Sequence, residues 1–301
     1  MRTPVYIVYL QYGDKHQREG VERLRSLAHR FFPAREIELL VVDNALTGGF
    51  EHSLGPNLTL ISGENSSREF SGYDRGVEWL ERAGKTDPNA SYLLANDTYL
   101  SSYGSDYIDL FSAENVSEAE SMGGILGYTD GYPKPITLYG YPLKSWVRTS
   151  LMFLPGRVLS RLRPFALPAP RSEVLSGHLS FFVEPSPLSE NYREYLKTWL
   201  FDSPVEGSEF REAWHSKKPL DERTLAAHTH KAWAILCEHF LSARAIQAGI
   251  PLISVNGHGV IRDASESPAR CRGSVASSGP ATPESAKSRA TSESSGLVLA
   301  P

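Results

Sequence analysis

Short apolar runs alternate with amphipathic segments through the first hundred residues, and this alternation most constrains what the chain can fold into. Four of the runs predict buried strands: residues 4–10, 37–44, 58–63 and 91–97. Between them, residues 16–32 and 67–83 repeat apolar side chains at helical spacing. Strands that alternate with helices predict an α/β fold, with a mostly parallel central sheet flanked by helices.

The second half of the chain is less regular. Residues 121–130 and 177–183 have strand-like patterns, and residues 145–162 predict a strand, a Pro-Gly turn and a helix. The longest helix signal covers residues 221–249, a helical C-terminal part with Asp221 as its expected N-cap.

The chain divides into one expected domain and a tail. Residues 1–261 predict a single globular domain, whereas residues 262–301 are rich in serine and contain no aromatic residue. Such a composition cannot bury enough apolar surface to offset the entropy lost on ordering. We therefore expect residues 262–301 to be a disordered tail.

Net charge, cysteine content and the pattern of apolar residues limit which partners and which cellular compartment we expect. The formal net charge is -4, so no general field attracts nucleic acid, and we expect no nucleic-acid partner. The two cysteines, Cys237 and Cys271, offer neither a Cys-x-x-Cys spacing nor a disulfide framework. The first 13 residues predict a strand and not a signal peptide, and no stretch reaches transmembrane length. These features predict a cytoplasmic protein.

Polar side chains end several of the predicted strands. Asp43-Asn44, Asn96-Asp97 and Asp130 each close an apolar run, and the ends of parallel strands share one edge of a sheet. Any one of these endings can be a turn, since Asn and Asp favour turns. Several of them on one edge indicate a ligand site beyond the carboxyl ends of the strands.

Two common nucleotide-binding sequences are absent. The residues after the first strand, QYGDKHQREG, contain no G-x-G-x-x-G, and no G-x-x-x-x-G-K-[ST] occurs in the chain. The phosphates of a nucleotide would then need another source of positive charge. A divalent metal held by a carboxylate, Mn²⁺ or Mg²⁺, is the usual substitute.

The order VVDN (41–44), EFSGYDRGV (69–77) and YLLANDT (92–98) resembles the nucleotide-sugar-binding half of GT-A-fold glycosyltransferases. The resemblance implies that Asp43 and Asn44 contact the nucleoside, together with Asp74 and Arg75. It places Asn96-Asp97-Thr98 at the D-x-D position, where Asn96 would contact the nucleotide and Asp97 would hold the metal. A full D-x-D has two carboxylates, and the family carries Asn at the position of Asp74.

Within that fold, the chain is most similar to rhamnan synthesis protein F-like and family-2-like enzymes, which share a segment like residues 145–162. A helical Glu shortly before Leu-Ser in those enzymes corresponds to Glu238 in EHFLS. The resemblance implies Glu238 as the base that takes the acceptor proton. Asp130 is the alternative base.

The resemblance implies an inverting, metal-assisted glycosyltransferase of polysaccharide or surface-glycan synthesis. Its donor would be a nucleotide-diphosphate sugar, bound by residues 1–130. Its acceptor would be a glycan or a lipid-linked sugar, bound by residues 131–261, with peripheral membrane association through a lipid-linked acceptor. Two alternatives stay open: a nucleotidyltransferase, and a non-catalytic GT-A-like domain that binds sugar or scaffolds a complex.

Overall fold

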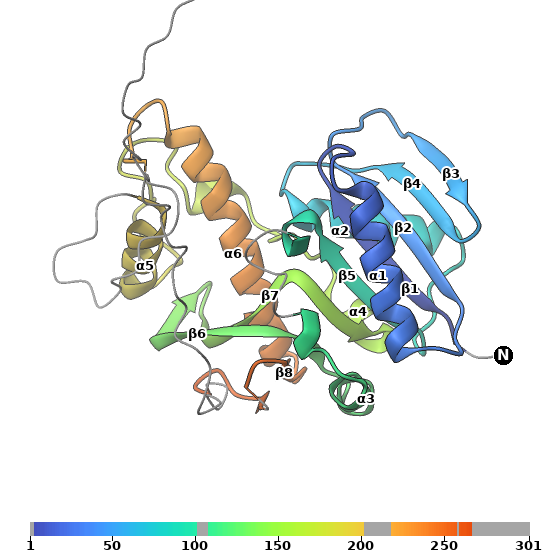
Figure 1. Ribbon diagram of the computed structural model, residues 1–301. Helices are drawn as coiled ribbons and strands as arrows, with labels where there is room; N and C mark the ends of the chain where they lie inside the picture. Colours follow the sequence, from blue (N-terminus) through green and yellow to red (C-terminus); the bar gives the residue numbers. More distant parts are fainter. Residues whose placement is uncertain (1–2, 101–107, 202–217, 258, 267–301) are drawn as a thin grey trace, which may run out of the picture. The chain divides into compact units, whose positions relative to one another are not determined.

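The computed structural model describes residues 3–100, 108–201, 218–257 and 259–266, which belong to one compact unit (Figure 1). Its strands are β1 (Val5–Gln11), β2 (Ile37–Asp43), β3 (Glu51–Gly55), β4 (Leu58–Ser62), β5 (Ser91–Asn96), β6 (Ile125–Leu138), β7 (Tyr141–Pro155), β8 (Leu252–Ser254) and β9 (Val260–Ile261). Its α-helices are α1 (Gln17–Phe31), α2 (Glu69–Arg82), α3 (Ala113–Met122), α4 (Gly156–Leu162), α5 (Glu190–Leu200) and α6 (Leu225–Gln247). The α/β class predicted from the sequence is confirmed.

The nine strands of the described residues form one mixed sheet, in the order β3-β4-β2-β1-β5-β7-β6-β8-β9. Strands β4, β2, β1 and β5 run parallel, as the strand–helix alternation predicts. The prediction of a mostly parallel sheet is wrong for the other half, because β7 pairs antiparallel with both β5 and β6. A short turn joins β6 to β7, and a connection this short can only make an antiparallel pair.

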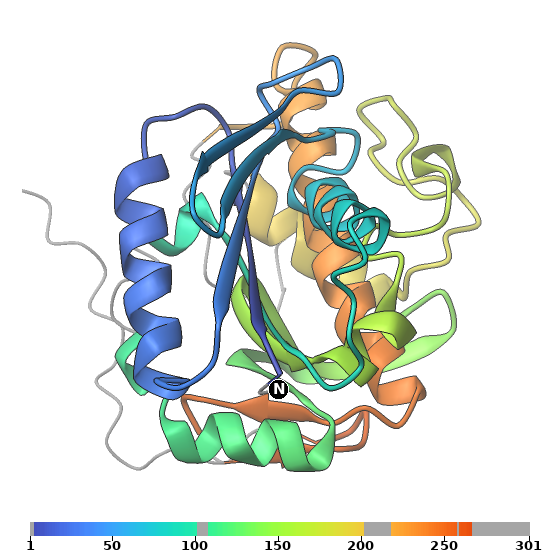
Figure 2. The same cartoon turned by 90° about the vertical axis from the view of Figure 1, so that its right-hand side faces the viewer.

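Helices cover both faces of the sheet (Figure 2). Helices α1 and α3 pack on one face, where Leu24 and Val116 join a cluster with the side chains of Ile7 and Val41. Helices α2, α4, α5 and α6 pack on the other face, in a second and larger buried cluster. Side chains alternate between the two faces along each strand, so both faces of the parallel strands are apolar and buried.

Glycines have two roles in these helices: one allows a close approach to the sheet, and another ends a helix. Gly76 of α2 lies against Val8, where an added Cβ would fall 2.6 Å from a valine methyl carbon. Gly123 ends α3 in the left-handed conformation, with φ 67°, which is why the strand expected from residue 121 begins at Ile125.

Other sequence predictions differ from the structure in their details. Residues 177–183 form a turn and a single bridge, not a strand, because the Phe181 N–H bonds back to the carbonyl of His178. Helices α3 and α5 had no prediction. Asp221 heads a hydrogen-bonded turn just before α6 and does not cap the helix itself, which begins at Leu225.

The tail was predicted to begin at residue 262, but residues 262–266 are placed against the domain. The Ser145 hydroxyl donates to the carbonyl of Glu266 at 2.9 Å. The rest of the predicted tail, residues 267–301, lies outside the described residues. Across the described ranges, no helix combines the length and the apolar character needed to cross a membrane.

Candidate active site

The parallel strands β1, β2 and β5 end side by side at one edge of the sheet. Gln11 is opposite Asp43 in the register, and Leu10 is opposite Asn96. A cavity of about 350 Å³ opens at this edge, lined by strand ends, the start of α2 and the first half of α6. Asn44, Asn96 and Asp97 all line it, so the structure brings these three predicted residues together. We call this cavity the strand-end cleft.

The sequence left open whether Asn96-Asp97-Thr98 forms a turn or a ligand site, and the structure has features of both. The side-chain oxygen of Asn96 accepts hydrogen bonds from the backbone N–H and the hydroxyl of Thr98, which is a turn role. Asp97 lines the cleft instead, and its Oδ2 accepts the backbone N–H of Tyr12 at 3.2 Å. Burial raises the pKa of Asp97, and Asp43 adds to the rise.

Asp43 is buried beneath the cleft edge. Its Oδ1 accepts the backbone N–H groups of Gly13 and Ala45, at 2.9 and 2.8 Å, and its Oδ2 accepts the side-chain amide of Gln11 at 3.0 Å. Asp43 is not among the residues that line the cleft. In this structure the carboxylate therefore fixes the loops that follow β1 and β2. The family resemblance had implied a nucleoside contact for the Asp43 carboxylate.

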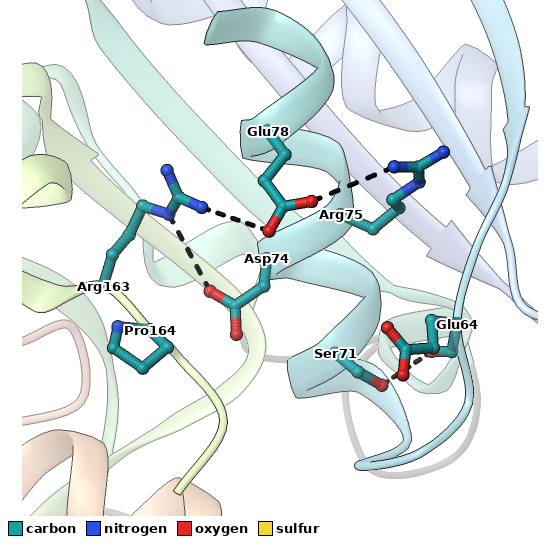
Figure 3. Close-up of a pocket in the computed structure, with 7 residues that line it drawn as sticks. All are labelled: Glu64, Ser71, Asp74, Arg75, Glu78, Arg163 and Pro164. Carbon is teal, nitrogen blue, oxygen red and sulfur yellow. Dashed lines mark hydrogen bonds and ion pairs between the residues drawn. The ribbon is translucent and has the colours of Figure 1, made fainter. Parts of the chain in front are cut away.

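Asp74 and Arg75 lie in a different cavity, of about 420 Å³, which shares no lining residue with the strand-end cleft (Figure 3). Asp74 accepts the backbone N–H groups of Phe165 and Ala166, at 2.8 and 3.0 Å. Burial raises the pKa of Asp74, although these two hydrogen bonds oppose the rise. The structure does not bring Asp74 or Arg75 to Asp97. Asp74 faces the loop after α4, and Arg75 forms an ion pair with Glu78 of its own helix at 3.9 Å (Figure 3).

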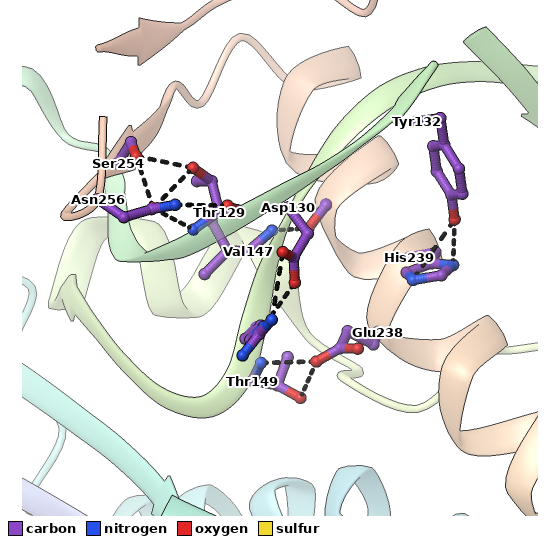
Figure 4. Close-up of polar contacts among 11 residues, drawn as sticks. Thr129, Asp130, Tyr132, Val147, Thr149, Glu238, His239, Ser254 and Asn256 are labelled. Atoms are coloured by element: carbon purple, nitrogen blue, oxygen red, sulfur yellow. Dashed lines mark hydrogen bonds and ion pairs between the residues drawn. The ribbon is translucent and has the colours of Figure 1, made fainter. Parts of the chain in front are cut away.

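Glu238 lies on α6, where Thr149 of β7 binds it (Figure 4). Its Oε1 accepts the Thr149 backbone N–H at 2.8 Å and the Thr149 hydroxyl at 3.0 Å. The pKa of Glu238 is raised to about 7, mainly by burial and in smaller part by the neighbouring Glu69. Thr149 and Lys231 act in the opposite direction. A carboxyl group with a pKa near neutral is suited to proton transfer.

A series of interacting charged side chains links Glu238 to the strand-end cleft. Glu69 lines the cleft at the start of α2, and burial raises its pKa, with Asp97 adding to the rise. Lys231 is close enough to both Glu69 and Glu238 that each raises its pKa, against the larger lowering caused by burial. Asp97, Glu69, Lys231 and Glu238 thus form one set of interacting charges. We call it the cleft charge cluster.

The residue after Glu238 anchors this part of α6. His239 Nδ1 lies 2.6 Å from the hydroxyl of Tyr132 on β6 (Figure 4). It also lies 2.6 Å from the hydroxyl of Tyr192 on α5. Burial lowers the pKa of His239 to about 3, so the imidazole stays neutral and belongs to the core. These contacts hold Glu238 in place and make the helix a rigid support for it.

Asp130 does not end a strand, contrary to the sequence prediction. It lies within β6, opposite Trp146 of β7, and forms an ion pair with Arg148 through both carboxylate oxygens, at 2.5 and 3.2 Å. The paired guanidinium occupies both carboxylate oxygens, which are the atoms that would accept a proton. This placement makes Asp130 a poorer base than Glu238.

No role was predicted from the sequence for Glu69, for Lys231 or for His230, which also lines the cleft. A signal for Lys231 was present, because it precedes Glu238 by two helical turns and so lies on the same face of α6. Glu69 carried no such signal, since its place depends on the packing of α2 against α6.

The donor atoms in the cleft suit a metal only in part. No group of three or more His, Cys, Asp or Glu side chains that could hold a metal occurs in the described part of the chain. Asp97 and Glu69 nevertheless line one cavity. One or two carboxylates are enough for Mg²⁺ when substrate phosphates supply further ligands.

Comparison with protein-family models and with curated proteins finds no match for this chain.

Proposed function

We propose that the chain is a GT-A-type glycosyltransferase that moves a sugar from a nucleotide-diphosphate sugar to a glycan or lipid-linked acceptor. The observation that carries the proposal is the cleft charge cluster. Asp97 and Glu69 line the cleft at the carboxyl edge of the parallel strands, and Glu238, which is not among the lining residues, has a pKa of about 7. Ligands bind outside the carboxyl ends of the strands in open α/β sheets. The resemblance of residues 41–44, 69–77 and 92–98 to GT-A-fold glycosyltransferases implies a nucleotide-diphosphate sugar as the donor that the cleft would bind.

In the proposed reaction, the acceptor hydroxyl oxygen forms a bond to the anomeric carbon of the donor sugar. The bond from that carbon to the diphosphate breaks, and its electron pair stays on the departing nucleoside diphosphate. The hydroxyl proton goes to the carboxylate of Glu238, which Thr149 orients through Oε1. A divalent ion held by Asp97 and Glu69 would supply positive charge to the diphosphate.

One observation favours a second function, a non-catalytic GT-A-like domain that binds sugar. The Asp43 carboxylate, expected to contact the base, is taken up by three internal hydrogen bonds. A binding domain would keep the strand-end cleft as a ligand site without needing proton transfer at Glu238.

A thermal-shift screen separates these functions. Nucleotides, nucleotide sugars and free sugars are added to the protein with and without Mn²⁺, and ligand binding raises the melting temperature by mass action. We expect a nucleoside diphosphate and its sugar conjugate to stabilise the protein, and the conjugate to be consumed when acceptor is added. Stabilisation by free sugar alone would support the binding domain and reject the transferase.

A further inference from the structure

Two arginines and a histidine from separate segments gather at and beside the strand-end cleft. Arg68 precedes α2, Arg171 lies in the 3-10 helix Arg171–Glu173, and His230 lies on α6. Arg68 and His230 line the cleft together with Asp97. Burial lowers the pKa of His230, and Arg171 and Arg68 add to the lowering, so its imidazole is neutral near pH 7. Burial also lowers the pKa of Arg171, with a further contribution from Arg68. We call Arg68 and Arg171 the rim cations.

Trp233 connects the segments that carry the rim cations. Its indole N–H donates to the hydroxyl of Ser67 at 3.1 Å, which ties the residue before Arg68 to α6. The guanidinium of Arg171 lies over the same indole ring, 5.6 Å from its centre. Trp233 is buried, so the rim cations are placed by a core residue and their proximity is built into the fold.

The rim cations differ from other arginines of the chain in their partners. Arg163 reaches three carboxylates, and Arg148 is held by both oxygens of Asp130. Within the ranges that the structure describes, no ion pair and no side-chain hydrogen bond joins Arg68, Arg171 or His230 to another residue. Glu69, the residue after Arg68, also lines the cleft, and burial raises its pKa while Arg68 opposes the rise. Positive charges placed together without paired carboxylates favour an anionic ligand.

We propose that the rim cations bind the diphosphate of the nucleotide donor, and that this binding does not require a metal. The inference rests on the proposed transferase function and deepens it by assigning the diphosphate subsite. The two guanidiniums match the negative charges of a diphosphate, and Arg is suited to bidentate contact with phosphate oxygens. The neutral imidazole of His230 can donate one further hydrogen bond. The same groups would stabilise the charge that develops on the departing nucleotide.

The test measures binding of inorganic pyrophosphate by calorimetry in buffer containing EDTA. We expect wild type to bind, and Arg68→Ala and Arg171→Ala each to weaken binding about tenfold or more, because each removes charge-assisted hydrogen bonds. Arg68→Lys, which keeps the charge, should lose less affinity than Arg68→Ala. Arg82→Ala is the matched control, since Arg82 is an exposed arginine in the last turn of the same α2 helix. Melting temperatures confirm that each variant folds.

Asp97→Asn separates this inference from the metal site. The variant should bind pyrophosphate in EDTA at least as well as wild type, because it removes a negative charge from the cleft. Binding that appears only after Mn²⁺ is added, or that is unchanged in Arg68→Ala and Arg171→Ala, would overturn the inference. Pyrophosphate binding without any sugar transfer would keep the anion subsite and reject the transferase.

Discussion

Thr149 donates both its backbone N–H, at 2.8 Å, and its hydroxyl, at 3.0 Å, to the same oxygen of Glu238. The carbonyl of Thr149 in turn accepts the hydroxyl of Tyr73 on α2, at 2.8 Å. Thr149 of β7 therefore connects Glu238, the proposed base, to α2, the helix that begins at the strand-end cleft. Hydrogen bonds to the ionised carboxylate lower its pKa against the effect of burial.

The first prediction concerns the pH dependence of transfer. Because Glu238 must be ionised to accept a proton, kcat should rise with pH through about 7 and level off above it. Thr149→Val removes a hydrogen bond that lowers the pKa of Glu238, so the midpoint should move to higher pH. Glu69→Gln removes a charge that raises the pKa, so the midpoint should move to lower pH. Rate profiles of both variants check the signs, and shifts in the same direction would contradict the assignment.

The second prediction concerns stability. The folded-state pKa of Glu238, about 7, lies above the ordinary Glu value near 4.3. The folded protein therefore holds the extra proton between these values, and wild-type stability falls as pH rises through this window. Glu238→Gln removes the ionisation, so it should gain roughly 1–3 kcal/mol over wild type at pH 8, discounted for partial exposure. Urea unfolding at pH 4 and pH 8 measures the gain, which should vanish at pH 4.

The same Glu238→Gln protein should lose sugar transfer, because an amide cannot accept the proton. A variant that is more stable at pH 8 and still inactive identifies a residue kept for chemistry. Transfer at the wild-type rate would remove Glu238 from the reaction and leave the stability prediction standing.

The third prediction concerns Asp43. Asp43→Ala leaves the N–H groups of Gly13 and Ala45 and the amide of Gln11 without their acceptor, so it should cost about 2–4 kcal/mol. The free energy of unfolding from urea titration measures the loss. Asp14→Ala, an acidic residue in the loop after β1 whose side chain makes no such contacts, serves as the control and should change stability little. Equal stability of Asp43→Ala and wild type would show that these bonds do not hold the loops.

The fourth prediction concerns Asp97. An amide oxygen can still accept the Tyr12 N–H, so Asp97→Asn should fold normally with an unchanged melting temperature. At limiting Mn²⁺ its transfer rate should fall by about 10²-fold or more, because a hard cation requires the carboxylate charge. Single-turnover assays across Mn²⁺ concentrations measure the loss. A turn role alone would leave the rate at the wild-type value, since Asn serves turns as well as Asp.

The local sequence determined the parallel half of this protein. The spacing of apolar residues along α1, α2 and α6 and the continuous apolar runs of β1, β2, β4 and β5 are properties of neighbouring residues, so they could be read directly. The rule that parallel strands end at one edge then brought Asn44, Asn96 and Asp97 to one cleft.

Tertiary structure decided the rest, because those features depend on residues far apart in the chain. The direction of β7 and the partner of Asp130 follow from the β6–β7 pairing, which an apolar run does not encode. The pKa of Glu238 depends on Thr149, 89 positions away, and on the packing of α2 that brings Glu69 near. Asp43 and Asp74 were both predicted as ligand contacts, but the N–H groups of Gly13, Phe165 and Ala166 that they accept come from loops that only the folded chain places beside them. The identity of a side chain is local, whereas its hydrogen-bond partners and its charge state are set by the fold.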